Sequence, residues 1–284
     1  MKTYNEIYLK TRNNLKEGGI EAFNLEAKLL VSKAAGKTVA ELMRDLNLYT
    51  SDEICNKVQE FTARRLTGEP IAYLSGAWEF YGMPLYITKD VLIPRPETEL
   101  LVDITKELLT GNNMNARVLD LCTGSGCIAL AIAREMPATH VLAVDISAMA
   151  LEVARKNIIR NRLGSRVICM QADAAGSPPM GLGEFDMIVS NPPYVPTDEI
   201  AELDATVKDY EPVWALDGGK DGLKFYRSII KYWRVLLKKN GYVVFEVGED
   251  QAEKVSDMLT LAGFKMTQIR KDAYGVDRAV IAQL

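Results

Sequence analysis

The chain has 284 residues, 48% of them apolar and 25% charged, so its composition is that of a globular protein and not of a disordered one. Its formal net charge of -4 excludes an overall basic surface that would hold nucleic acid through its phosphates, and we expect no direct nucleic-acid partner. The four cysteines form no C-x-x-C pair and there is one histidine, so we expect no metal. With no signal-peptide core and no run of 18 apolar residues, we expect a cytoplasmic protein without a membrane segment.

The first part of the chain has a helical pattern. A Thr3-x-x-Glu6 capping box precedes apolar residues at helical spacing, and Ser51 is a predicted N-cap for a later helix. The pattern contains no β-branched alternation up to Leu66. We therefore expect residues 1–73 to form a small helical bundle.

A different pattern begins near residue 74. The segment "IAYLSGAWEFYGMPLYITKDVLIP" mixes aromatic and β-branched residues with glycine, which predicts a hairpin-like linker over residues 74–93. A helix is predicted to follow, from Glu97 to Leu109. We place the start of the second domain at residue 94.

From Arg117 onward strands and helices alternate. The apolar runs "RVLDL", "HVLAV", "RVICM", "FDMIV" and "GYVVFEV" are typical of strands buried on both faces. Helices are predicted between them, for example over Ser147–Asn161 and Gly222–Lys239, and two final strands, "FKMTQI" and "RAVIAQ", predict an antiparallel pair. Residues 94–284 are therefore expected to form a doubly wound α/β domain.

The first of these strands runs into a glycine-rich loop, "DLCTGSGCIALAIA". Gly124 and Gly126 allow close approach of a ligand, and Asp145, 21 residues after Gly124, can accept hydrogen bonds from ribose hydroxyls. These features predict a nucleoside cofactor. Because Gly124-x-Gly126-x-x-Ala129 also satisfies the dinucleotide fingerprint, an NAD-dependent oxidoreductase remains an alternative.

Two carboxylates favour S-adenosylmethionine over NAD. Asp120 opens the loop, where its charge would repel a pyrophosphate but suit a sulfonium and an amino group. Asp173 follows the third strand, where it could accept a hydrogen bond from an adenine amine.

With "DLCTGSGCIAL", "VDIS", "QADA" and "NPPY", the chain resembles the S-adenosylmethionine-dependent N5-glutamine methyltransferases of the HemK/PrmC type. "GEPIAYLSGAWEFYGMPLYITKDVLIPRPETELLV" and "YEPVWALDGGKDGLKFYRSII" are also similar to that family. The resemblance implies a class I, Rossmann-like methyltransferase domain that converts S-adenosyl-L-methionine to S-adenosyl-L-homocysteine. The cofactor-binding residues it implies are Thr98, Cys122, Thr123, Gly124, Ser125, Gly126, Asp145, Asp173, Ala174 and Asn191.

The resemblance also implies a substrate, the glutamine of the Gly-Gly-Gln loop in class I peptide chain release factors. It implies that the N-terminal helical domain helps to dock this protein, and we expect the enzyme to be a monomer. The enzyme that modifies a glutamine of ribosomal protein L3 shares related motifs, but "PRPETE", Pro94 to Glu99, favours the release-factor enzyme. Cys122 stands where many members have glycine, from which we expect no positive φ at this position.

The stretch "SNPPYVP" follows the fourth strand, at the edge where ligands of such sheets bind. Asn-Pro and Pro-Pro are also turn signals, so a simple turn is the alternative. We expect Asn191 and Pro192 to accept the two N–H groups of the substrate amide, with Pro193 stiffening the segment and Tyr194 forming a flat wall. Asn191, Pro192 and Tyr194 are the predicted catalytic residues.

Two shorter segments each allow two roles. Pro96, Glu97 and Thr98 are expected either to cover the methionine end of the cofactor or to start a helix, and Glu211-Pro212 either to shape the substrate side or to form a surface turn.

Two further functions stay open. An adenine-N6 nucleic-acid methyltransferase would present similar N–H groups to the Asn-Pro-Pro-Tyr motif, although the acidic charge argues against it. A non-catalytic adaptor would use the helical domain alone.

Overall fold

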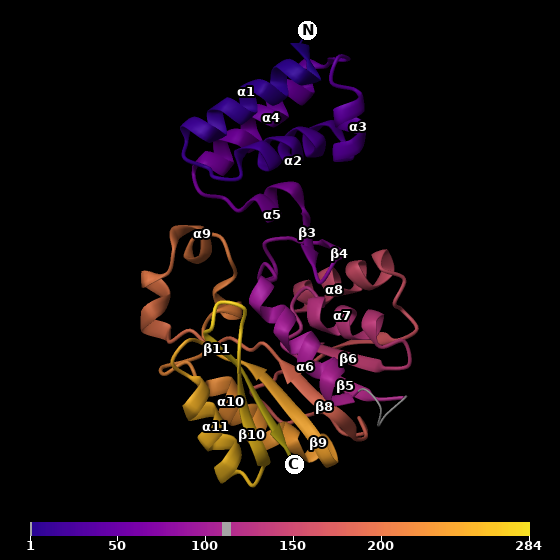
Figure 1. Ribbon diagram of the computed structural model, residues 1–284, viewed down its shortest axis with the longest axis vertical. Coiled ribbons are helices and arrows are strands. Elements are labelled where there is room, and N and C mark those ends of the chain that lie inside the picture. Colours follow the sequence, from indigo (N-terminus) through magenta and orange to yellow (C-terminus); the bar gives the residue numbers. More distant parts are fainter. Residues whose placement is uncertain (1, 110–114) are drawn as a thin grey trace. The chain divides into compact units, whose positions relative to one another are not determined.

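The computed structural model describes residues 2–109 and 115–284, which form two compact units (Figure 1). The first unit comprises the chain up to Ala77 together with Ala205–Tyr210. The second comprises Trp78–Asp204 and Glu211–Leu284. Each unit is described on its own below.

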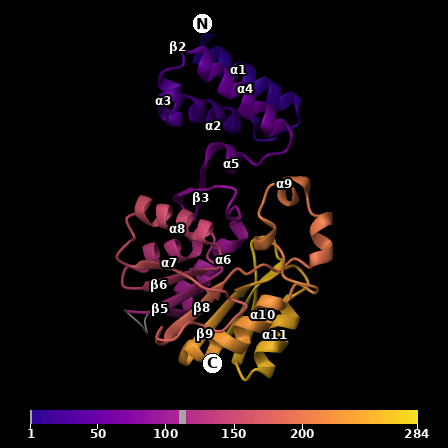
Figure 2. The ribbon, with the colours of Figure 1, turned by 180° about the vertical axis from the view of Figure 1, so that it is seen from behind.

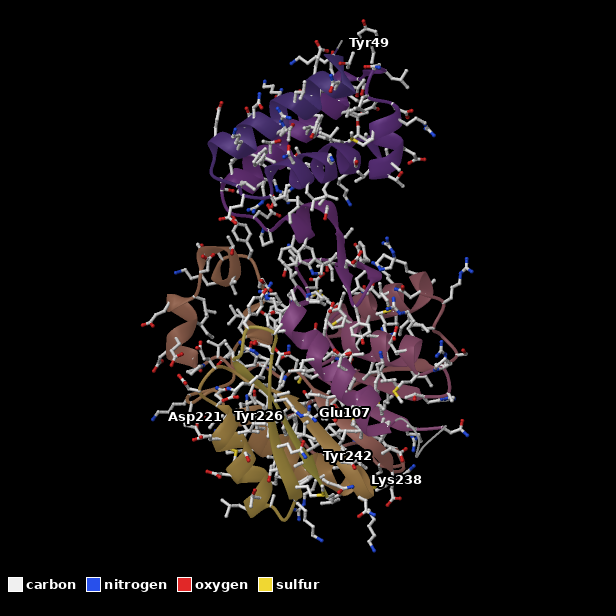
Figure 3. All side chains as sticks on the ribbon, in the orientation of Figure 1. Tyr49, Glu107, Asp221, Tyr226, Lys238 and Tyr242 are labelled. Atoms are coloured by element: carbon white, nitrogen blue, oxygen red, sulfur yellow. The ribbon has the colours of Figure 1, made fainter. Side chains whose placement is uncertain are left out.

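The first unit is helical. Its helices are α1 (Tyr4–Glu17), α2 (Phe23–Ala35), α3 (Val39–Arg44), α4 (Asp52–Leu66), α5 (Ile71–Ser75) and α9 (Ala205–Lys208). The predicted Thr3–Glu6 capping box and the Ser51 N-cap are both confirmed, and Leu15 and Leu30 are fully buried in the core. The sequence pattern did not indicate the short pair β1 (Lys2–Thr3) and β2 (Tyr49–Thr50), on which Tyr49 is exposed (Figure 3).

The predicted pair of short strands, β3 (Ala77–Phe80) and β4 (Met83–Tyr86), lies where the second unit begins, and only Ala77 of this pair belongs to the first unit. A 3₁₀ turn, η1 (Pro96–Thr98), then leads into α6 (Glu99–Leu109), so the helix predicted from Glu97 is confirmed with a tighter first turn. Pro96 at the start of this turn has no backbone N–H to leave unpaired.

A seven-stranded sheet forms the centre of the second unit. Its strands are β5 (Arg117–Leu121), β6 (His140–Asp145), β7 (Val167–Gln171), β8 (Phe185–Ser190), β9 (Leu237–Glu246), β10 (Lys265–Lys271) and β11 (Asp277–Gln283). Their order in the sheet is β10-β11-β9-β8-β5-β6-β7. The strands from β9 to β7 run parallel, and β11 is antiparallel to both β9 and β10, which confirms the predicted antiparallel end.

Helices connect these strands and pack against them (Figures 1 and 2). They are α7 (Cys127–Glu135), α8 (Ala148–Arg160), α10 (Lys224–Ser228) and α11 (Ala252–Leu261), with short turns η2 (Thr197–Glu202), η3 (Val213–Ala215), η4 (Ile229–Trp233) and η5 (Arg234–Leu236). The helix predicted over Ser147–Asn161 is confirmed, because Ser147 and Asn161 are its two caps. In Figure 1, α7 and α8 accompany β6 and β7, whereas α11 lies beside β10 and β11, and α6 packs against β9.

The prediction of one helix over Gly222–Lys239 was wrong. Helical structure there is broken into α10, a π-helical turn and a 3₁₀ turn, and it ends at Leu236. Lys238 and Lys239 instead lie on β9, where Leu237 pairs with Phe185 and Lys238 forms an ion pair with Asp186 at 2.8 Å (Figure 3). Strand pairing thus overrides the helical pattern.

The core of the second unit lies where these broken helical turns meet β9. Tyr226 and Trp233 are fully buried there, and the Tyr226 hydroxyl donates to the carbonyl of Glu246 at 2.8 Å (Figure 3). The carboxyl end of β9 is therefore anchored from within the core.

Candidate active site

The connections of the sheet create a crevice at one edge. The chain passes from β5 outward to β6 and β7, then returns so that β8 lies on the other side of β5. At such a switch point the loops leave in opposite directions, and ligands of parallel sheets bind there. A cleft of about 850 Å³, open mouth included, lies among the residues that follow β5, β6, β7 and β8.

Nine of the ten predicted cofactor residues line this cleft. They are Thr98, Cys122, Thr123, Gly124, Ser125, Asp145, Asp173, Ala174 and Asn191. Gly126 is not among the lining residues. It caps α7 with a φ of 82°, and a Cβ there would lie 3.3 Å from the Cβ of Ala154, so glycine allows the loop to pack closely on α8.

The loop after β5 is tied to the loop after β6. Asp145 Oδ2 accepts the backbone N–H of Gly124 at 2.8 Å, and its Oδ1 accepts that of Ser147 at 2.9 Å. Burial raises the pKa of Asp145, and these two backbone N–H groups oppose the rise. Gly124 has a φ of 52° and faces open space where a side chain would stand. Ligand can therefore approach its backbone closely.

The expectation for Cys122 was wrong: its φ is 61°, in the left-handed region. Three loop positions, Cys122, Gly124 and Gly126, share this conformation, which side chains disfavour because of their Cβ. The turn of the loop therefore holds Cys122 in this conformation although it carries a Cβ.

Asp120 does not face the cleft, contrary to the role expected for it. It is fully buried, and its Oδ2 accepts the Thr123 hydroxyl at 2.5 Å and the Ala129 backbone N–H at 3.2 Å. Burial raises its pKa to about 7. Asp120 thus joins the loop to the first turn of α7, and the acidic groups that line the cleft are Asp145, Asp173 and Asp90.

Asp173 and Ala174 follow β7 by a short turn. Asp173 Oδ1 accepts the backbone N–H of Ala175 at 2.8 Å, which fixes the carboxylate at the cleft wall, and Ala174 is buried beside it. A carboxylate held in this way can accept a further N–H donor from a ligand.

Asn191 and Thr98 meet at the cleft from positions 93 residues apart in the chain. Asn191 Nδ2 donates to Thr98 Oγ1 at 3.2 Å, and Thr98 is 2% exposed. The segment of Pro96, Glu97 and Thr98 thus starts a helix, as one of its two predicted roles requires, and of the three residues Thr98 lines the cleft.

The remaining residues of the Asn-Pro-Pro-Tyr motif differ in whether they line the cleft, and Gln251 and Gly222 pack against the backbone of Tyr194. Pro193 lines the cleft, whereas Pro192 and Tyr194 do not. The Tyr194 carbonyl accepts Gln251 Nε2 at 2.8 Å, and a Cβ on Gly222 would come within 2.3 Å of that carbonyl oxygen. Burial raises the pKa of the Tyr194 phenol to about 12, so it stays neutral.

An ion pair supports another wall of the cleft. The Glu211 side chain is 1% exposed; its Oε1 accepts Arg95 Nη2 at 2.5 Å and its Oε2 accepts the Ile93 backbone N–H at 3.1 Å. The alternative of a surface turn at Glu211 is therefore wrong. Arg95 itself lines the cleft, as do Trp214 and Phe225.

Glu246 is a further polar residue behind this site. It ends β9, is 2% exposed, and its Oε2 has no hydrogen-bond partner among the residues that the structure describes. Burial raises its pKa to about 7, and the neighbouring Thr98, Arg278 and, more weakly, Asn191 oppose the rise.

Sequence reasoning missed Arg95, Trp214, Phe225 and Glu246 as parts of the site. For Glu246 a signal was present, because a carboxylate inside the apolar run "GYVVFEV" at the end of a parallel strand must lie at the ligand edge. Of the other three, Arg95 stands in an irregular segment and Trp214 in a short 3₁₀ turn, where periodicity carries no information, and Phe225 lies on α10 within a stretch that was predicted only as a helix.

Two general findings concern the described part of the chain. No group of three or more His, Cys, Asp or Glu is arranged there to hold a metal ion. Within the same residues, no helix is long and apolar enough to cross a membrane.

Comparisons with known proteins agree with this geometry. Residues 6–76 match the family model of the PrmC N-terminal domain, and residues 97–207 that of the methyltransferase small domain. The chain is 40% identical over 245 residues to a release factor glutamine methyltransferase of Thermodesulfovibrio yellowstonii, with 84% of this chain and 86% of that one covered. It is 37% identical to one from Clostridium acetobutylicum, with 96% of both covered.

Among solved structures, a methyltransferase from Pyrococcus furiosus has the same fold. It superposes with a TM-score of 0.54 at 22% identity, over 79% of this chain and 98% of that one. The second unit is a class I methyltransferase domain.

Proposed function

The chain belongs to the release factor glutamine methyltransferase family, and from this we propose that it methylates the side-chain nitrogen, N5, of the glutamine in the Gly-Gly-Gln loop of class I peptide chain release factors. The methyl donor in this proposal is S-adenosylmethionine, and the product is S-adenosylhomocysteine. The observation that carries the proposal is the placement of the Asn191 amide on the wall of the glycine-loop cleft, beside Thr98.

The cleft fits the proposed cofactor. Open space beside Gly124, an apolar wall with Ile146 and Phe225, and the carboxylates of Asp145 and Asp173 suit a nucleoside that carries positive charge. When bound, S-adenosylmethionine would supply a methyl group on a positively charged sulfur, which needs no further activation.

The chain must then orient a poor nucleophile, because the lone pair of an amide nitrogen is delocalised into its carbonyl. We propose that Asn191 Oδ1 accepts one N–H of the substrate amide and that the Pro192 carbonyl accepts the other. Both acceptors fix the nitrogen and favour its change toward tetrahedral geometry. Pro193 limits the freedom of the Pro192 carbonyl, and Tyr194 supports the segment.

No general base is needed in this proposal. The nitrogen becomes acidic as its bond to carbon forms, and its proton can pass to water. The neutral phenol of Tyr194 is therefore assigned packing and not proton transfer.

The partner is a protein, so a docking surface is required as well as a cleft. We propose that the helical part of the chain, residues 1–73, helps to dock the release factor, that residues 74–93 link it to the methyltransferase domain of residues 94–284, and that a monomer acts in the cytoplasm. The match of residues 6–76 to a domain model specific to this enzyme type supports the docking role.

The test uses radiolabelled S-adenosylmethionine with purified substrates. Label should appear on a class I release factor and not on its variant with alanine in place of the Gly-Gly-Gln glutamine. Ribosomal protein L3 and an adenine-containing RNA serve as competing substrates. Label on the alanine variant, or transfer to L3 or RNA in preference to the release factor, would overturn the assignment.

A further inference from the structure

The proposed role of Asn191 depends on which end of its amide faces the cleft. With Oδ1 toward the substrate, it accepts an N–H of the glutamine amide. With Nδ2 toward the substrate, two NH₂ groups would meet and neither could accept. Because the two ends are similar in size, packing alone does not choose between them. A hydrogen-bond partner that can only accept or only donate has to do so.

Thr98 cannot fix the orientation by itself. Its hydroxyl receives Asn191 Nδ2–H at 3.2 Å, but a hydroxyl can equally well donate to Oδ1 of a reversed amide. The orientation is determined only if the hydroxyl proton of Thr98 is engaged elsewhere.

Glu246 lies where it can engage that proton. β8 and β9 run parallel with Ser190 opposite Phe245, so the next residues, Asn191 and Glu246, emerge at the same edge of the sheet. The Glu246 carboxyl is buried and keeps Oε2 without a partner among the described residues, and Thr98 and Asn191 both lower its pKa. An ionised carboxylate is acceptor-only, and buried acceptors of this kind hold donors toward themselves.

We propose that Glu246 is a positioning residue: its carboxylate accepts the Thr98 O–H, which leaves Thr98 to accept Asn191 Nδ2–H and turns Asn191 Oδ1 toward the substrate. This inference rests on the proposed methylation of glutamine. No covalent step passes through Glu246, and Glu246 does not line the cleft.

Glu246 fixes the orientation of the Thr98 hydroxyl and of the Asn191 amide only while it is ionised, because a protonated carboxyl can donate as well as accept. Transfer should therefore rise as pH increases through the range in which Glu246 loses its proton, near pH 7. Arg278 on β11 favours the ionised form and Glu97 on η1 opposes it. The other ionisable groups that interact with Glu246 remain neutral near pH 7, namely Tyr194, Tyr226 and Cys127.

The experiment compares E246Q with the matched control Glu249→Gln, an exposed carboxylate three residues later. A glutamine at 246 can present either its oxygen or its NH₂ to Thr98. The direction in which the Thr98 hydroxyl donates, and with it the orientation of the Asn191 amide, is then no longer fixed. We expect kcat on the release factor to fall about tenfold, the lower end of the loss that removal of a hydrogen-bond partner behind a metal ligand causes in metalloenzymes. KM for the release factor and the calorimetric affinity for S-adenosylmethionine should change less than threefold, and E249Q should match the wild type.

The pH profile separates positioning from a merely structural role. The wild type should lose activity below about pH 7, whereas E246Q should lack this acid limb. If E246Q does not fold, Thr98→Val and Thr98→Ser replace it: the valine variant, which lacks the hydroxyl, should lose kcat, and the serine variant should retain it.

The two proposals fail in different ways. Wild-type transfer to the release factor with an E246Q profile like that of the wild type would overturn the role of Glu246 alone, as would equal kcat values for the two Thr98 variants. Absence of wild-type transfer would overturn the proposed function and, with it, this inference.

Discussion

Arg95 and Glu211 form an ion pair in which Nη2 and Oε1 are 2.5 Å apart, although 116 residues separate them in the chain. The carboxylate also accepts the Ile93 backbone N–H, so it joins two segments that line the cleft. Since the Glu211 side chain is buried and that of Arg95 is 35% exposed, the two partners do not contribute equally to stability.

Replacing Arg95 with methionine should therefore destabilise the protein by about 1 to 3 kcal/mol, less than for a fully buried pair, because it leaves the buried Glu211 carboxylate without its cation. Urea unfolding measures this loss. The double variant Arg95→Met/Glu211→Gln should recover part of it, since no unpaired charge remains. A double variant less stable than the sum of its two single changes would contradict this explanation.

Asn191→Ala should abolish methyl transfer while S-adenosylmethionine affinity stays within a few fold of the wild type. The substitution removes the proposed acceptor for the substrate amide but leaves Gly124, Asp145 and Asp173 in place. Single-turnover transfer and calorimetry measure the two quantities. Asn56→Ala, an exposed change on α4, is the control. Equal loss of transfer and of cofactor affinity would show that Asn191 binds cofactor instead of orienting substrate.

Cys122→Gly should be more stable than Cys122→Ala by about 1 kcal/mol, because glycine adopts a φ of 61° without the strain that any Cβ brings. Both variants lose the thiol, so the difference between their free energies of unfolding reports the backbone strain at position 122. Urea unfolding midpoints at equal m-values provide the comparison. An alanine variant as stable as the glycine variant would mean that position 122 is not strained.

Glu246 should make stability depend on pH. Its folded-state pKa is about 7, above the ordinary value of 4.5, so the native state binds more protons than the unfolded state between these values. Stability from this group is therefore lost as pH rises from about 4.5 through 7, by up to about 3 kcal/mol. E246Q should be more stable than the wild type at pH 8, with the gain vanishing below pH 5. If the difference in free energy of unfolding between E246Q and the wild type did not change with pH, the raised pKa of Glu246 would not be the cause.

Local signals predicted much of the fold. The Thr3 and Ser51 caps bond to residues three positions later in the chain, and each buried parallel strand is a short continuous apolar run. Both signals can therefore be read from the local sequence. The segment from Gly222 to Lys239 was misread because its periodicity is helical throughout, yet strand β9 takes Leu237 to Lys239 by pairing with β8. Pairing between distant segments leaves no trace in local spacing.

The residues of the candidate site were also predicted only in part. The residues of the glycine loop were identified because a motif contains them, and Asp145 because it ends a strand at the expected spacing. Asp120 was assigned to the cleft from its charge alone, whereas the structure buries it against Thr123 and Ala129. Which way a side chain points depends on the packing of neighbouring elements, and composition does not contain that information.

The Asn-Pro-Pro-Tyr segment has a consequence for engineering. Its backbone is held by Gly218 and Gly222, where added Cβ atoms would lie within 2.8 Å of Tyr194, and by the side chain of Gln251. Transplanting these four residues into another parallel sheet would move the Asn191 amide without the residues that hold its backbone in place. A successful graft has to carry the distant glycine pair and the glutamine as one unit, and during divergence these positions should change together or not at all.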